Sequence, residues 1–161
     1  HTGYRTAAEV IDYNSNPTIF SHSNPLKLWE HRRNIPDALM QACAAKGGVV
    51  GLNGIGIFLG DVSTDTMVRA IDYVTTLIGP EHVALGLDYM FDTSELDELI
   101  VKMPHAFPAS LGYKPGMEVP MVEPERIPAI GEALLGLGYS DANVAGILGG
   151  NLLRVAGQVW K

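Results

Sequence analysis

The sequence predicts an α/β fold built on a parallel β-sheet. Short runs of consecutive apolar residues alternate with segments whose apolar residues recur at helical spacing, a pattern typical of sheets covered on both faces. The chain starts at His1, and polar residues follow the apolar runs at His22, Asn53 and Asp88. The intervals between them, roughly 20 to 35 residues, each fit one strand–helix–strand unit. Each polar residue would therefore lie at the C-terminal end of a strand, the edge where α/β proteins build their sites.

The length and composition limit the class of protein. The chain has 161 residues, 47% of them hydrophobic, and a formal net charge of −7. This length fits one ordinary domain or a piece of a larger one, and the first residue is His rather than Met, so we expect processing or preceding residues. The acidic balance argues against a general nucleic-acid binder, because phosphate contacts need clustered Lys and Arg. The only basic pair, Arg32-Arg33, is too small for such a surface. No apolar run approaches the roughly 20 residues of a membrane span.

The first half of the chain is expected to contain two helices and two strands. Polar residues ending at Pro17 stop the first helix, and Pro36 suits the first position of the second, with Asp37 behind it. The pair Gly47-Gly48 stops that helix. In chain order, the expected elements are a helix over residues 6–13, a strand over 18–21, a helix over 36–45 and a strand over 49–52.

The second half is expected to be mainly helical. A long helix opens at Ser63 or Thr64, carries Asp65 in its first turn and ends at Gly79-Pro80. The elements expected after it are a strand over 83–87, a helix over 94–102, a helix over 127–135 and a bent pair of helices from Ser140 to Trp160. Between them, residues 103–124 contain five prolines, which forbid regular structure and indicate a lid, an interface or a disordered segment. We therefore divide the chain into 1–102, 103–124 and 125–161.

Several motifs are expected to carry no chemistry. The glycine-rich run 51–56 departs from the G-x-G-x-x-G spacing, and we expect no helix after it, so a dinucleotide site is rejected. The single Cys43 excludes an intrachain disulfide and is expected to be a packed, inert thiol. His31, His82 and His105 have no partner pattern, and we expect solvated loop positions for all three.

Two histidines are candidate metal ligands. His1 and His22 would end neighbouring strands, within reach of a shared metal ion. Neutral imidazole is a good zinc ligand, but a zinc site needs three or four ligands, and the chain has no His-x-His or His-x-Asp pair to complete one. Taken alone, a histidine in Phe-Ser-His-Ser is more often a hydrogen-bonded loop residue.

Two charged residues are candidates for catalysis and substrate binding. Asp88 ends an apolar strand, where a carboxylate can act as general acid or base, although it can equally cap the following turn. Asp92, deeper in the loop, is the weaker candidate. Arg33 suits the bidentate binding of a substrate carboxylate, or else a surface ion pair with Glu30 or Asp37.

The sequence resembles the renal (membrane) dipeptidase family of the metal-dependent amidohydrolase superfamily. The resemblance spans nearly the whole chain, in the same order and with matching spacing. Its most specific part is Phe-Ser-His-Ser around His22, followed by Arg33. The segments that carry it are residues 1–3, 17–24, 32–37, 47–53, 83–88 and 146–155.

This resemblance implies the C-terminal portion of a (β/α)₈ TIM barrel with two zinc ions at the C-terminal ends of its strands. In the family a metal-bridging hydroxide attacks the dipeptide carbonyl. His1 and His22 match ligands of the second zinc, Arg33 matches the residue that binds the terminal carboxylate of the substrate, and Asp88 matches the acid/base. Family members accept a range of dipeptides, often with a C-terminal D-residue.

The sequence departs from the family in two respects. The His-x-Asp pair, the bridging Glu and a further His of the N-terminal half are absent from residues 1–161, so we expect the chain alone to be incomplete for catalysis and to need that half as a partner. The run Tyr89-Met90-Phe91-Asp92 replaces an Asp-Phe-Asp-Gly run, which suggests a bacterial-type variant with altered substrate preference. We expect a cytoplasmic location and a possible homodimer that uses residues 103–124.

Two other functions stay open. The leading hypothesis is a zinc dipeptidase. The first alternative is a non-catalytic α/β scaffold or binding module that has lost the chemistry. A third hypothesis is an amidohydrolase that acts on another carboxylate-bearing amide or on a lactone. The joint presence of His1, His22, Arg33 and Asp88 favours the enzyme, because a decayed site has no reason to retain all four.

Overall fold

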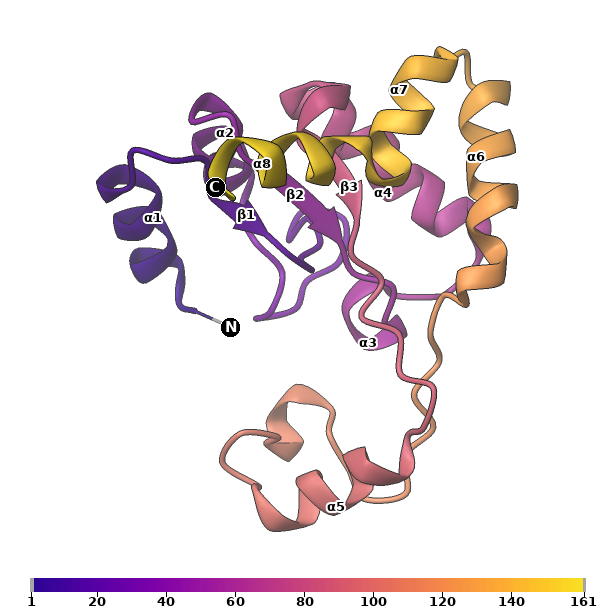
Figure 1. The fold of residues 1–161 in the computed structure, drawn as a ribbon. Coiled ribbons are helices and arrows are strands. Elements are labelled where there is room, and N and C mark those ends of the chain that lie inside the picture. The colour runs from indigo at the N-terminus through magenta and orange to yellow at the C-terminus, as the bar shows by residue number, and fades with distance from the viewer. Residues whose placement is uncertain (1, 161) are drawn as a thin grey trace.

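A three-stranded parallel sheet forms the centre of the computed structural model, which describes residues 2–160 (Figure 1). The strands lie in chain order: β1 (Ile19–Phe20), β2 (Val49–Leu52) and β3 (Val83–Leu85). Ile19 lies opposite Val49, and Val50 lies opposite Val83. Parallel neighbours need crossover connections, and helices supply them here. The predicted parallel sheet is confirmed, although β3 ends at Leu85 rather than at residue 87.

The helices follow the expected order along the chain. Ser63 accepts a hydrogen bond from the Thr66 amide, and Ser140 accepts one from the Asn143 amide, so both predicted helix starts are capped by serine. The α-helices are α1 (Tyr4–Tyr13), α2 (Asp37–Ala45), α3 (Gly56–Leu59), α4 (Thr64–Ile78), α5 (Ser94–Lys102), α6 (Ile127–Gly136), α7 (Asp141–Ala145) and α8 (Asn151–Val159). Shorter turns are the 3₁₀ segments Pro80–His82, Ala109–Leu111 and Pro124–Arg126 and the π segment Gly146–Gly150.

Apolar side chains cover the sheet on both faces. Alternate residues of a strand point to opposite faces, so Val50 and Leu52 join the main core with residues of α2 and α4. Val49 and Ala84 face the other way and contact Val155 of α8, which crosses that face in Figure 1. Two layers of helices thus fix the sheet and its carboxyl edge.

Two local expectations are wrong. A single helical turn, α3, follows the glycine-rich run directly, because Phe58 and Leu59 find apolar partners there and are buried. The turn is too short to show a periodic pattern in the sequence. Pro36 is the N-cap of α2 rather than its first helical residue, with an extended backbone at φ −72°, ψ 153°. The glycines of residues 51–56 still lack the G-x-G-x-x-G spacing of a dinucleotide-binding site, so the presence of α3 does not restore that interpretation.

Residues 94–120, which we call the arm, extend from the carboxyl edge of the sheet (Figure 1). At the base of the arm, Gly54 donates its amide hydrogen to the Leu87 carbonyl at 3.0 Å and accepts the Val122 amide at 2.8 Å. The Gly56 amide likewise donates to the Pro120 carbonyl. Apolar residues of the arm form a second small core with Ile55 and Phe58. Residues 103–124 thus have a few apolar side chains packed in this core. Their backbone is irregular apart from the 3₁₀ turn Ala109–Leu111 and the start of Pro124–Arg126.

Cys43 is a packed thiol, as predicted. Its side chain is fully buried and donates to the Thr18 carbonyl at 3.3 Å. Burial raises the pKa of the Cys43 thiol to about 11, so the thiol stays protonated at neutral pH. Among the helices within residues 2–160, none is both long enough and apolar enough to cross a membrane.

Gly51 and Gly86 let the backbone at the end of β1 come close to β2 and to the residue that follows β3. A Cβ atom placed on either glycine would overlap the Ser21 carbonyl oxygen, which belongs to the residue before His22. The Ser23 amide, on the other side of His22, donates to the Gly51 carbonyl at 2.8 Å. The position of His22 therefore depends on two neighbours that have no side chain.

We expect Gly86→Ala to lower the free energy of unfolding by about 1–3 kcal/mol, because the added methyl group overpacks against backbone that cannot move alone. Gly136→Ala is the matched control, since a Cβ atom there meets nothing within 4 Å. In a helix this change raises stability by about 0.5–1 kcal/mol. Urea denaturation of both variants gives the comparison, and equal stabilities would contradict the close approach.

Candidate functional site

The candidate site lies on the loops that follow the three strands. His22 comes after β1, Asn53 directly after β2, and Asp88 after β3. The carboxyl ends of parallel strands meet at one edge, so the predicted register does place these residues on the same edge of the sheet. His1 lies outside the described residues.

His22 borders a cavity of about 420 Å³ between α1 and β1. Its Nδ1 atom lies 2.6 Å from the Ser21 hydroxyl oxygen, which orients the ring. Arg32 and Arg33 line the same cavity, and Tyr4 and Ile11 of α1 contribute to its opposite wall. The structure thus brings together two of the predicted site residues, His22 and Arg33, around one space.

Arg33 is held by aromatic side chains. Its guanidinium carbon lies over the Phe58 ring of α3, 4.7 Å from the ring centre, in a cation–π arrangement. Its Nη1 atom donates to the Tyr113 hydroxyl at 3.5 Å. The backbone amide of Arg33 donates to His31 Nδ1 at 3.1 Å. A guanidinium fixed in this way has little rotamer freedom left to lose when it binds an anion.

Asp88 has an unusual backbone. Among residues 2–160 it is the only non-glycine residue with a positive φ, at 57°, in the left-handed region that most side chains avoid. Its Oδ2 atom accepts a hydrogen bond from Asn53 Nδ2 at 3.2 Å. Strained backbone of this kind concentrates at functional sites, where surrounding contacts hold it in place.

Asp92 has a local structural role instead. Its Oδ1 atom accepts the Ser94 amide at 2.9 Å, at the start of α5. Hydrogen bonds from the Ser94 amide and hydroxyl lower the pKa of Asp92 because they favour the charged carboxylate. The carboxylate therefore caps the turn before α5, the role that was the alternative for Asp88.

Asn53 and Asn24 form a buried pair that the sequence analysis did not identify. Each side chain is only 1% exposed. Asn24 Oδ1 accepts the Asn53 amide at 3.0 Å, and Asn24 Nδ2 donates to the Asn53 carbonyl at 3.0 Å. The Ile55 amide donates to Asn53 Oδ1 at 2.7 Å. The available signal was an asparagine directly after a buried strand, which by itself is typical of an ordinary turn.

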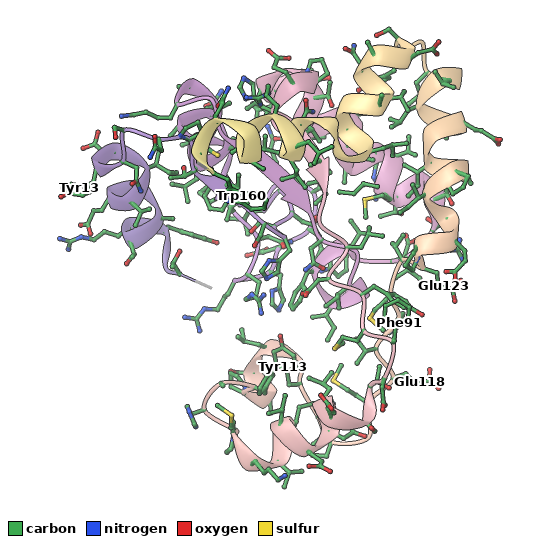
Figure 2. All side chains as sticks on the ribbon, in the orientation of Figure 1. Tyr13, Phe91, Tyr113, Glu118, Glu123 and Trp160 are labelled. Carbon is green, nitrogen blue, oxygen red and sulfur yellow. The ribbon has the colours of Figure 1, made fainter. Side chains whose placement is uncertain are left out.

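Tyr113 of the arm is a further residue that the sequence analysis missed. Figure 2 shows it on the side of the arm that faces the sheet. Its side chain is buried, and the Phe107 ring packs edge-on against it at 5.2 Å. Burial raises the pKa of Tyr113; the Arg33 guanidinium opposes this shift and the Asp88 carboxylate adds to it. The phenol therefore lies within the electrostatic influence of both predicted charged residues.

Two histidines expected in solvent are held by the fold. The His31 ring lies 4.9 Å from the Phe58 ring, and its Nε2 atom lies 3.3 Å from the Leu111 carbonyl oxygen of the arm. The Nδ1 atom of His82 lies 2.7 Å from the Gly48 carbonyl oxygen. The expectation of solvated positions is wrong for both, because partners distant in sequence reach them. His105 is exposed, as expected.

The described residues do not complete a zinc site. Residues 2–160 contain no group of three or more His, Cys, Asp or Glu side chains placed to hold a metal ion. A protein zinc site has three or four such ligands. Among the predicted ligands, only His22 belongs to this part of the chain.

Comparison with known proteins places these residues in context. The family model described as membrane dipeptidase (peptidase family M19) matches residues 1–104. The dipeptidase aclJ of Aspergillus oryzae is 32% identical over 164 residues, which cover 99% of this chain and 34% of that protein. An amidohydrolase structure from Pseudomonas aeruginosa superposes with a TM-score of 0.83 at 28% identity, over 99% of this chain and 51% of that one.

A further solved structure shares the fold. It is a metallopeptidase from Rhodobacter sphaeroides, liganded with a phosphinate mimic of the dipeptide L-Ala-D-Ala, with a TM-score of 0.68 at 19% identity. The superposition covers 96% of this chain and 39% of that structure. In four curated relatives the matched segment covers 28% to 54% of the relative's length, so the chain spans about half of them or less.

We expect Phe58→Ala to loosen the arm, because it removes the ring that contacts His31, Arg33 and the core of the arm. A loss of about 3–5 kcal/mol is typical for a buried phenylalanine. Trypsin cleavage after Lys102 in the arm should become faster. Phe91→Ala is the matched control, since that ring is 91% exposed, and comparable acceleration in both variants would show that Phe58 does not hold the arm.

Proposed function

The chain belongs to the membrane dipeptidase family, peptidase family M19, and on this premise we propose that it supplies the substrate-carboxylate and acid–base part of a zinc-dependent dipeptidase. The observation that carries the proposal is the arrangement of His22, Arg33 and Asp88 at one sheet edge. His22 and Arg33 line one cavity, and Tyr113 is close enough to Arg33 and Asp88 to be influenced by both. The substrate class is a dipeptide with a free C-terminal carboxylate.

In this proposal Arg33 binds the carboxylate of the substrate. Its planar guanidinium can bind a carboxylate through two parallel hydrogen bonds, and the Phe58 ring lies 4.7 Å beneath its central carbon. The Tyr113 hydroxyl lies beside the guanidinium and can donate to the same anion. Binding the end of the dipeptide places its peptide bond at a fixed distance from the anchor, so that orientation contributes to the rate.

Asp88 is proposed to move the proton. Its carboxylate accepts a proton from the attacking water and donates it to the amine that leaves when the C–N bond breaks. The solvent-exposed position of Asp88 at the strand ends gives it access to both groups. The left-handed backbone directs the side chain from the loop after β3 toward the space next to Asn53.

We propose that the metal of this family is zinc here, with His22 and His1 among its ligands and the remaining ligands from outside residues 2–160. When bound, zinc supplies Lewis acidity toward the peptide carbonyl and toward water. The Ser21 hydroxyl forms a hydrogen bond with His22 Nδ1, and a bond of this kind fixes the ring of a ligating histidine.

We also propose that residues 1–161 form the C-terminal part of a (β/α)₈ barrel. Three consecutive parallel strands with helical crossovers support it, as does the superposition on about half of the Pseudomonas aeruginosa amidohydrolase. The N-terminal half of such a barrel would be the partner that completes the site. Activity is therefore to be measured on the longest natural reading frame that contains residues 1–161.

Asp88→Asn should lower kcat for dipeptide hydrolysis by about 10²–10⁴-fold, because the amide cannot take up the proton. Hydrolysis is measured on a panel of dipeptides that includes L-Ala-D-Ala, and the metal content is measured in parallel. Wild-type protein should contain zinc and lose activity to a chelator, and His22→Ala should lower the zinc content. Full activity in Asp88→Asn would refute the acid–base role, and a metal-free, inactive wild type would favour the binding-module hypothesis.

Arg33→Lys should raise KM for a dipeptide by roughly tenfold with kcat within a few-fold, because lysine retains the charge but loses the bidentate geometry and the stacking on Phe58. The matching dipeptide amide, which has no carboxylate, serves as the control substrate. Its KM should hardly respond to the substitution. If KM rises equally for both substrates, Arg33 does not bind the substrate carboxylate. An amidohydrolase that acts on other substrates then becomes the better hypothesis.

A further inference from the structure

We infer that Asn53 is a positioning residue that holds the Asp88 carboxylate and determines which of its two oxygens exchanges the proton. The inference rests on the proposed acid–base role of Asp88 and adds a residue to it. The observation that carries it is the 3.2 Å hydrogen bond from Asn53 Nδ2 to Asp88 Oδ2, donated by a side chain that is 1% exposed.

The direction of this hydrogen bond is fixed by the other contacts of Asn53. Its side-chain Oδ1 accepts the Ile55 amide at 2.7 Å. A flipped amide group would turn its own N–H groups toward that backbone N–H, donor against donor. Nδ2 is therefore the atom that faces Asp88, and it can only donate. Asp88 Oδ2 must act as the acceptor, which the ionised carboxylate does well.

Asn53 is itself held in place, because its backbone N–H and C=O groups are both hydrogen-bonded to the Asn24 side chain. The Asn53 amide donates to Asn24 Oδ1, and the Asn53 carbonyl accepts from Asn24 Nδ2, each at 3.0 Å. Asn24 also donates to the Phe58 carbonyl at 3.1 Å, which ties the pair to α3. A rigid donor is what a positioning role requires, since a catalytic group must be held within about 0.5 Å of its working geometry.

Asp88 needs such a partner. It lies on a loop beyond the end of β3, with an exposed side chain and a left-handed backbone. A free carboxylate there would sample several rotamers, and only some would face the reacting atoms. The hydrogen bond to Oδ2 favours the rotamers that keep this contact. It leaves Oδ1, on the other side of the carboxylate, as the oxygen that takes up and returns the proton.

The test is a double-mutant cycle on kcat and KM for a hydrolysed dipeptide, in the longest natural reading frame. Asn53→Ala should lower kcat by roughly 10–100-fold with KM within about twofold, as for other residues that orient a catalytic group. In the Asp88→Asn background the same substitution should change kcat less than about threefold, because the group it positions is gone. Equal losses in both backgrounds would overturn the inference.

Asn151→Ala is the matched control. Asn151 is also a buried asparagine, and it donates to the Pro80 and Val83 carbonyls at 2.8 Å, without contact to Asp88. It should lower the melting temperature and leave kcat unchanged. If Asn53→Ala lowers the melting temperature in the same way but also leaves kcat unchanged, Asn53 is a structural residue only.

A second variant covers the case in which Asn53→Ala fails to fold. The serine of Asn53→Ser can still accept the Ile55 amide in the same type of turn but is too short to reach Asp88. It should show the same loss of kcat and the same non-additivity. Full activity in Asp88→Asn would instead refute the proposed function, which separates that failure from a failure of the Asn53 assignment.

Discussion

Hydrogen bonds from three buried asparagine side chains hold together the loops at the carboxyl edge of the sheet. Asn24 bonds both backbone polar groups of Asn53, and Asn34 donates to the Trp29 and Phe58 carbonyls, each at 2.8 Å. The Phe58 carbonyl accepts from both Asn24 and Asn34. Loops lack regular backbone pairing, so their buried amide and carbonyl groups need such partners, and loss of one leaves an unpaired group in the interior.

This network links parts of the site that are distant in sequence. Asn34 is the neighbour of Arg33, Asn24 follows His22 closely, and Asn53 reaches Asp88. The metal-ligand candidate, the carboxylate-binding candidate and the acid–base candidate therefore share one scaffold. The arm is joined to the same edge by the apolar cluster around Phe58 and by hydrogen bonds at Pro120, Tyr113 and Leu111, and its apolar contacts are less directional than those bonds. The two parts of the site thus differ in how strictly they fix side-chain orientation.

Elements with local signals were predictable from the sequence. Residues 94–102 and 49–52 have the predicted bounds, and the serine caps of α4 and α7 lie where the sequence indicated. The placement of polar residues at strand ends followed from the alternation of apolar runs and helices. Such features depend on neighbours within a few residues, so the sequence contains most of the information.

Features that depend on distant partners were not predictable. Tyr113 reaches Arg33 across 80 residues, and His31 reaches the Leu111 carbonyl across the same separation. Nothing near Tyr113 distinguishes it from other residues of a proline-rich segment. From the sequence alone, Asn53 is only the polar residue that follows a strand. Its contacts with Asn24 and Asp88 form only after three loops have come together, so no local pattern indicates them. The family resemblance supplied the roles of His22, Arg33 and Asp88, but not the residues that hold them.

The buried thiol has a practical consequence for studying this sheet. Cys43 is the only cysteine of the chain, and its sulfur lies against the Thr18 and Val49 carbonyls beneath β1 and β2. A thiol reagent reaches such a sulfur only when the surrounding structure opens. Where closing outpaces the reaction, the labelling rate measures the opening equilibrium rather than surface reactivity. The molecule thus contains its own probe of how often the sheet beneath the site comes apart, without any added label.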